Sequence, residues 1–230
     1  GRTQDVNVVA ISNWLNELGV KLEEVRIISD MEDSIVKTIN DVRKNFNYVF
    51  TTGGIGPTHD DITSKSIAKA FNISYGYHKE AYEILEQYYG KSEFNEGRKK
   101  MAMLPDKALL ILNPSSGAPG FIVDNVYCLP GVPSILKSML GGLNSKINGG
   151  KKILSKTMHL KTVESEIAEP LEKVQNKFKD IEIGSYPFFR MGKVGVSIVM
   201  RSTEKNKIDV CYKKIISFIK KRKILIIKRD

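Results

Sequence analysis

Long apolar runs, cysteine pairs and histidine clusters are what this sequence has least of. Its longest apolar runs, such as 108–112 and 224–227, are four or five residues, whereas a membrane-spanning helix needs about 20. We therefore expect no membrane association. Cys128 and Cys211 stand far apart without a C-x-x-C pair, and the three histidines lack metal-ligand spacing, which excludes a zinc cluster or redox pair. Two free thiols and no secretory segment predict a cytoplasmic protein.

Positive charge is in excess, but it is unevenly spread. Lys and Arg number 36 against 26 Asp and Glu, a net charge of +10. Residues 213–230 hold eight basic residues and one acidic residue, so the rest of the chain carries only +3. A nucleic-acid groove needs basic residues over a whole face, with aromatic rings for stacking. We therefore expect a solvated basic tail and no nucleic-acid partner; contact of the tail with RNA or an anionic surface is the alternative.

The composition is that of a folded protein with a sizeable core. The chain has 230 residues, a length typical of one or two domains. Hydrophobic residues make up 41% of it, close to the globular norm of about 45–50% once glycine is counted in place of tyrosine.

Residues 1–142 alternate helical and strand patterns, which predicts an α/β domain of three layers with a mostly parallel sheet. The expected helices are 4–18, 32–46, 61–71, 79–89, 93–104 and 132–140, and the expected strands are 24–28, 48–52, 109–112, 120–123 and 126–129.

A linker and a small second domain follow. Residues 143–152 are rich in Gly, Asn and Ser, which is typical of a linker. Residues 153–230 then read strand, helix, strand, strand, helix, strand, with the basic tail at the end. This order predicts a small α+β domain of split-βαβ type, ferredoxin-like or KH-like.

A cluster of glycines directly after the buried strand 48–52 is the most informative feature. Gly53, Gly54 and Gly56 can bring main-chain amides close to an anion, and ligands of parallel sheets bind beyond the carboxyl ends of strands. The spacing matches neither the dinucleotide fingerprint nor the P-loop. Thr52 and Thr63 flank this loop and can donate hydrogen bonds.

Asp60 and Asp61 come at the start of the next expected helix, and three roles are open to them. Asp60 can cap the helix, with Asp61 favoured by the helix dipole. The pair can instead hold Mg²⁺ or Mn²⁺ beside a phosphate, or orient an attacking water.

Two further strand ends carry polar side chains. Pro114, Ser115, Ser116 and Gly117 form either an ordinary turn or a second cradle for a phosphate, pterin or ribose group. Asp30 follows the expected strand 24–28 and, taken alone, is a helix N-cap.

Residues 51–63 resemble the signature of the molybdopterin-binding (MogA/MoaB-type) fold and, more narrowly, the N-terminal domain of the competence/damage-inducible protein A (CinA) family. Further matches follow in order along the chain. They are Asn95-x-x-Arg98, residues 101–105, 113–121 and 129–133, and, in the second part, residues 184–187. Residues 1–7 resemble the segment after the family's first strand, which implies that this strand is missing here. Related domains are fused to FAD synthases in eukaryotes.

The resemblance implies a function and a site. The implied activity is hydrolysis of a nucleotide diphosphate of the ADP-ribose type, with Asp30, Asp60 and Asp61 as catalytic carboxylates and Asp60 and Asp61 as ligands of Mg²⁺, Mn²⁺ or Co²⁺. Molybdopterin binding or adenylylation is a second possibility, and a non-catalytic nucleotide-binding or interaction module a third. The relatives imply a homodimer or homotrimer. The implied ligand-binding residues are Asn7, Thr52, Gly53, Gly54, Gly56, Thr63, Pro114, Ser115, Ser116 and Gly117.

Overall fold

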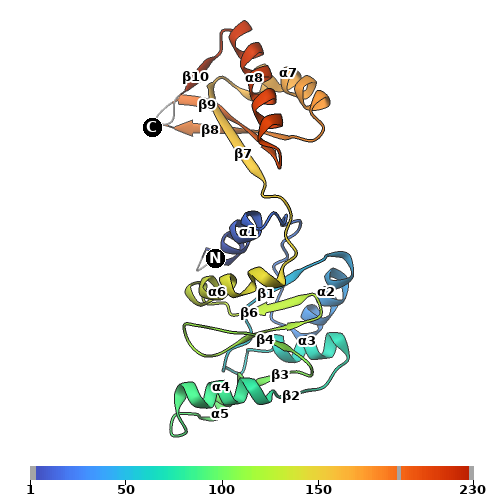
Figure 1. Ribbon diagram of the computed structural model, residues 1–230, viewed down its shortest axis with the longest axis vertical. Coiled ribbons are helices and arrows are strands. Elements are labelled where there is room, and N and C mark those ends of the chain that lie inside the picture. The colour runs from blue at the N-terminus through green and yellow to red at the C-terminus, as the bar shows by residue number, and fades with distance from the viewer. Residues whose placement is uncertain (1–3, 191–192, 228–230) are drawn as a thin grey trace. The chain divides into compact units, whose positions relative to one another are not determined.

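The computed structural model describes residues 4–190 and 193–227, so the first three residues of the matched N-terminal segment lie outside it. The chain divides into two compact units (Figure 1). The first contains Gly1–Leu15 and Lys21–Asn148, and the second contains Asn16–Val20 and Gly149–Asp230. Among the described residues, no helix combines the length and the apolar character needed to cross a bilayer.

A mixed four-stranded sheet forms the centre of the first unit. In spatial order its strands are β1 (Val49–Thr52), β6 (Val126–Leu129), β5 (Gly120–Val123) and β4 (Leu109–Ile111). β1 and β6 run parallel, whereas β6 with β5 and β5 with β4 run antiparallel. The α/β class is confirmed, but the parallel pairing is limited to β1 and β6. The cause is the two-residue turn at Asp124 and Asn125, where Asp124 has φ +53° and β5 folds straight back on β6.

Helices cover both faces of this sheet, which confirms the three-layer arrangement (Figure 1). On one face, Phe121, Val123 and Cys128 belong to the same buried core as residues of the helices 32–45, 63–71 and 79–89. On the other face, Phe50 and Tyr127 stack at 5.1 Å between ring centroids, and Trp14 meets Phe50 edge-on at 5.8 Å. The helices of this unit are α1 (Asn7–Glu17), α2 (Glu32–Asn45), α3 (Thr63–Phe71), α4 (Lys79–Tyr89), α5 (Glu96–Lys100), α6 (Pro133–Leu140) and the 3-10 helix η1 (Gly141–Lys146).

Two short strands were not expected from the sequence. β2 (Tyr75–Tyr77) pairs antiparallel with β3 (Met103–Pro105) to form a separate two-stranded sheet. The expected helix 93–104 is therefore wrong at both ends, since only α5 is helical. Helical spacing of apolar residues continued past Lys100, but pairing with β2 decides the conformation of residues 103–105.

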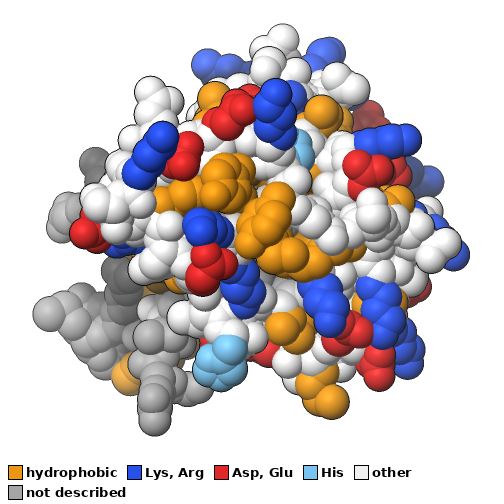
Figure 2. Space-filling model, turned by 90° about the horizontal axis from the view of Figure 1, so that it is seen from below, with side chains coloured by type: hydrophobic (Ala, Val, Ile, Leu, Met, Phe, Trp, Pro, Cys, Tyr) orange, Lys and Arg blue, Asp and Glu red, His pale blue; other side chains and the backbone are white. Residues whose placement is uncertain are grey.

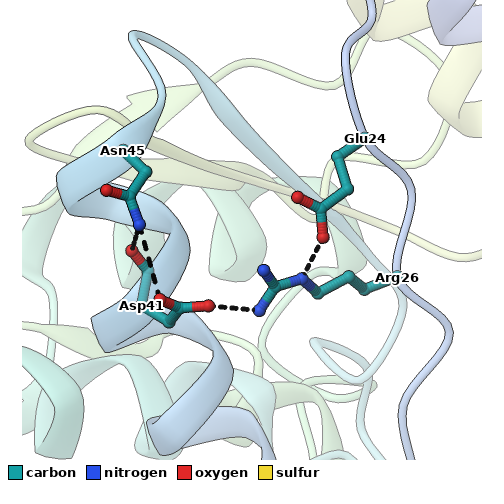
Figure 3. Close-up of polar contacts among 4 residues, drawn as sticks. All are labelled: Glu24, Arg26, Asp41 and Asn45. Carbon is teal, nitrogen blue, oxygen red and sulfur yellow. Dashed lines mark hydrogen bonds and ion pairs between the residues drawn. The ribbon is translucent and has the colours of Figure 1, made fainter.

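Residues 24–28 were predicted as a strand, and this prediction is wrong. The segment is extended, but residues 20–28 make no hydrogen bond between main-chain groups within the described chain. Side chains hold it instead. Arg26 binds Glu24 and lies 2.5 Å from a carboxylate oxygen of Asp41 on α2, which also accepts from Asn45 (Figure 3). Among the described residues, β1 pairs on one side only, with β6; the missing first strand that the resemblance implies stays a prediction.

The second unit is a four-stranded antiparallel sheet with two helices on one face (Figure 1). Its alternating residues Met158, Leu160, Val196, Ile198 and Met200 are buried with apolar residues of both helices. This is the predicted split-βαβ arrangement, in its ferredoxin-like form. In spatial order the strands are β10 (Leu225–Ile227), β7 (Leu154–Lys161), β9 (Lys193–Ser202) and β8 (Glu182–Arg190), and the helices are α7 (Glu164–Lys177) and α8 (Lys205–Lys221).

Candidate functional site

Three loops leave the sheet of the first unit at the same edge. Thr52 of β1 pairs with Leu129 of β6, and Ile111 of β4 pairs with Gly120 of β5. Because Phe121 pairs with Cys128, these strand ends lie in one row across the sheet. The glycine loop after β1, the turn after β6 and the loop after β4 therefore start at one level, within three strand spacings, or about 14 Å.

The glycine loop depends on glycine at two positions. Gly53 and Gly54 have φ of +94° and +70°, a region that side chains rarely adopt. A Cβ on Gly54 would lie 2.1 Å from the Thr63 hydroxyl oxygen, and the Thr63 amide donates to the Gly54 carbonyl over 2.9 Å. The structure thus brings Gly53, Gly54 and Thr63 together, as the sequence predicts.

Asp61 turns back into the loop rather than capping a helix. Its Oδ2 accepts hydrogen bonds from the Thr58 amide at 2.8 Å and the Thr58 hydroxyl at 2.5 Å. A Cβ on Gly56 would lie 2.7 Å from the same oxygen, so only glycine leaves room for this carboxylate. The helix α3 starts at Thr63, its N-cap is Ile62, and no side chain caps it. The capping interpretation of the two carboxylates is therefore wrong.

Asp60 is an exposed carboxylate that stays ionised. The Thr58 side chain, whose single hydroxyl proton is shared with Asp61, and the main-chain amide of Asp60 hold the pKa of Asp60 below its usual value, and the charges of His59 and Lys100 act in the same direction. Lys100 donates to the Thr58 carbonyl and so places a cation beside the acidic loop. Nothing in the spacing of the run Arg98-Lys99-Lys100 singled it out.

Asn7 contacts the turn after β6. Its side-chain amide donates to the Gly131 carbonyl over 2.8 Å, and Gly131 packs closely on the Cα of Gly53. Asn7 is 7% exposed, and no donor in the described part of the chain reaches its Oδ1. A buried acceptor without a donor is uncommon, and Thr51 Oγ1 and Asn125 Oδ1 share this feature in the described part of the chain. The position of Asn7 thus agrees with its predicted place in the site, and Gly131 joins it.

The loop after β4 is built around Asn113. Its Oδ1 accepts from the amides of Ser115 and Ser116, at 2.9 and 3.2 Å, and its amide donates to the Ser116 hydroxyl at 2.7 Å. Ser115 hydrogen-bonds over 2.8 Å to Ser138 of α6, the helix that follows Gly131. The predicted residues Pro114, Ser115, Ser116 and Gly117 therefore lie in one ordered turn. No hydrogen bond joins this turn to the glycine loop among the described residues.

Asp30 is exposed and does not cap a helix. The N-cap of α2 is Met31, without a side-chain cap, so the N-cap interpretation is wrong here as well. In the described part of the chain, no three or more His, Cys, Asp or Glu residues form a group suited to a metal ion. A cation at Asp60 and Asp61 would therefore have to complete its ligands with ligand phosphates and water, as Mg²⁺ commonly does.

A cleft of about 640 Å³ lies elsewhere, between residues 26–29 and α2. None of the residues predicted for the site lines it. Two cations line the cleft. The Arg26 guanidinium is already paired with Glu24 and Asp41 (Figure 3), and Lys37 is the other cation. The cleft and the glycine loop are thus separate features.

Both parts of the chain resemble known families. Residues 1–147 match the family described as a probable molybdopterin binding domain, and residues 152–227 match the middle domain of FAD synthase.

Full-length relatives agree with these matches. A protein of Archaeoglobus fulgidus is 31% identical over 207 residues, which cover 90% of this chain and 88% of that protein. A CinA-like protein of Prochlorococcus marinus strain MIT 9215 is 29% identical over 96% of this chain and 54% of its own length. The chain thus spans about half the length of such CinA-like relatives.

Among solved structures, a protein CinA of unknown function from Thermoplasma acidophilum is similar. It superposes with a TM-score of 0.60 at 29% sequence identity and covers 64% of this chain and 89% of its own. The likeness extends to the fold as well as to the sequence.

Proposed function

Because this chain is a CinA-like member of the molybdopterin-binding domain family, we propose that it binds a nucleotide through its glycine loop and hydrolyses a nucleotide diphosphate of the ADP-ribose type with a divalent cation. The observation that carries the proposal is the meeting of the glycine loop, the carboxylates Asp60 and Asp61, and Asn7 with its unpartnered oxygen at one sheet edge.

Each loop has a role in binding. The amides of Gly53, Gly54 and Gly56 hold a phosphate, because glycine exposes the main chain there. Asn7 accepts a hydrogen bond from the ligand through Oδ1. The turn at Ser115 and Ser116 receives a hydroxyl-bearing part of the ligand, since strand spacing puts it about 14 Å or less from the glycine loop. Thr52 lies exposed at the end of β1 and donates from its hydroxyl.

The acidic pair fits a cation that is shared with a phosphate. Asp60 is ionised and exposed, and Thr58 orients Asp61, so two carboxylates face a loop suited to an anion. Mg²⁺, Mn²⁺ or Co²⁺ bound there would supply charge neutralisation and a water of lowered pKa. Thr58 and Lys100 act by fixing the shape of this loop. Asp30 is proposed as a third carboxylate of the reaction.

The alternative is pterin chemistry, either molybdopterin binding or its adenylylation. It is favoured by the family to which residues 1–147 belong, and the same loop would serve, because that reaction also handles a pyrophosphate. In both cases we propose a cytoplasmic homodimer or homotrimer. A non-catalytic nucleotide-binding module remains the third proposal.

Turnover of ADP-ribose with Mg²⁺, Mn²⁺ or Co²⁺ tests the hydrolase. We expect AMP release that falls to background in Asp61→Asn and Asp60→Asn. Asp106→Asn is the matched control, since Asp106 is exposed in another loop and should retain full turnover. No turnover with any cation, or full turnover in Asp61→Asn, contradicts the proposal. Binding of molybdopterin without hydrolysis favours the pterin alternative, and nucleotide binding without turnover favours the non-catalytic module.

A further inference from the structure

The net positive charge of the chain lies in its second part. Residues 149–230 contain 20 Lys and Arg against nine Asp and Glu, whereas residues 1–148 contain 16 against 17. On the face of the molecule that Figure 2 shows, basic side chains (blue) and acidic side chains (red) are interspersed. The excess is thus a property of the ferredoxin-like unit. Residues 213–230 carry +7 of its +11, and residues 149–212 carry the other +4.

Among the described residues of this unit, helices cover only the face of the sheet to which Met158 and Leu160 belong. Met158 and Leu160 of β7 point into the core with α7 and α8, so Thr157 and Lys161, both exposed, point to the opposite, open face. The same alternation on β9 places Arg201 there, next to buried Met200.

Two aromatic rings lie on this open face. Register pairs Tyr186 with Ser197 and Phe188 with Gly195, and Ser197 hydrogen-bonds over 2.8 Å to His159 of β7. Tyr186 is 48% exposed. The two aromatic residues are two positions apart on one strand, or about 7 Å.

Glycines allow both rings to lie down on the sheet. A Cβ on Gly184 would lie 2.8 Å from the Tyr186 ring, and a Cβ on Gly195 would lie 2.4 Å from the Phe188 ring. The tip of each ring therefore lies over a glycine, where a larger residue would not fit. A ring that lies on a sheet in this way offers its other face as a platform.

We propose that the open face of this sheet binds single-stranded nucleic acid. Tyr186 and Phe188 stack on bases, because aromatic platforms accept any base, and Arg201 and Lys161 pair with phosphates. A four-stranded antiparallel sheet with aromatic residues on its open face is also a recurrent way of binding single-stranded RNA. Glu182 is paired in register with Arg201, so an acidic residue lies beside Arg201 on the same face.

This inference revises the expectation from the sequence, which assigned the charge to the tail and expected no nucleic-acid partner. That expectation rested on the basic residues being gathered in the terminal tail instead of spread over a face. Only the pairing of β8 with β9 places the rings on the same face as Lys161 and Arg201. The inference is independent of any activity at the glycine loop.

Fluorescence anisotropy of the full chain with a labelled polyuridine of about 20 nucleotides tests the proposal, with polythymidine and a duplex of the same length as comparisons. We expect Tyr186→Leu and Phe188→Leu each to weaken binding about 5- to 100-fold. Phe189→Leu is the matched control, because Phe189 is 72% exposed on the same strand but points to the other face. Arg201→Ala should lower the salt slope by about 0.7, and Lys213→Ala on α8 should not change it.

Several results would overturn the proposal. These are no binding at about 50 mM salt, equal affinity for duplex and single strand, equal losses in Tyr186→Leu and Phe189→Leu, or loss only when residues 220–223 are neutralised. The exposed Tyr186→Leu keeps the test decisive if Phe188→Leu fails to fold. If polyuridine and polythymidine bind equally well, the site accepts single strands of both RNA and DNA. If one binds more tightly, that preference identifies the natural ligand as RNA or DNA.

Discussion

Replacing Gly54 by alanine tests whether the glycine loop has the conformation described. The new Cβ meets two obstacles. The φ of +70° is strained for alanine by about 1–3 kcal/mol. The Thr63 hydroxyl oxygen lies 2.1 Å from the added atom, and relieving such an overlap in a packed region costs about 1–3 kcal/mol. The expected loss of stability is therefore about 2–6 kcal/mol.

Two other glycines separate these contributions. Gly90 has φ +74° but open space around an added Cβ, so Gly90→Ala should lower the free energy of unfolding by only about 1–3 kcal/mol. Gly76 has neither a positive φ nor any atom within 4 Å, so Gly76→Ala should stay within about 0.5 kcal/mol of the parent. Urea unfolding followed by fluorescence of Trp14, the only tryptophan, reports on the first unit.

A double-mutant cycle identifies the contact itself. In a Thr63→Ala background the nearest oxygen is gone, and Gly54→Ala should lose at least about 1 kcal/mol less than in the parent. If Gly54→Ala is as mild as Gly90→Ala, or if the two substitutions are additive, the close packing of Gly54 on Thr63 is wrong.

Three further outcomes are expected. Asn113→Ala should lower the free energy of unfolding by about 1–3 kcal/mol, because the amides of Ser115 and Ser116 lose their acceptor. Asn113→Asp keeps that acceptor and is the control. Equal urea midpoints for the two variants would contradict this role of Asn113. Burial raises the pKa of the Cys128 thiol to about 12 and that of Cys211 to about 11, so neither should react with a thiol reagent at pH 8 until the protein unfolds, and rapid labelling of the native protein would refute their burial. The pKa of Asp60 is lowered, so its carboxylate is charged throughout the range from pH 7 to pH 5 and the Mn²⁺ affinity should be unchanged over that range. A tenfold loss by pH 5 would show that a group of higher pKa controls binding.

The sequence predicted the glycine loop because its signal is local. An apolar strand that runs into Gly53, Gly54 and Gly56 needs no knowledge of the rest of the chain to indicate a loop of exposed amides. The strands 120–123 and 126–129 and the helix 79–89 were predicted with the bounds that the structure has. The two strands are short continuous apolar runs, and the helix keeps one helical period over its whole length.

The parts that were wrong depend on partners far along the chain. Asp61 turns toward Thr58 because Gly56 leaves the space, which is a contact and not a pattern. Residues 24–28 have the apolar alternation of a strand, but no strand pairs with them within residues 4–190 and 193–227. Lys100 reaches the Thr58 carbonyl across 42 positions, and no spacing could show this.

The most direct test of the account is a crystal structure of the protein with ADP-ribose and Mn²⁺. The account predicts the diphosphate against the amides of residues 53–56, with Mn²⁺ anomalous density between it and Asp60 or Asp61. Diphosphate density in the cleft between residues 26–29 and α2, or a glycine loop that stays empty at saturating ligand, would contradict it.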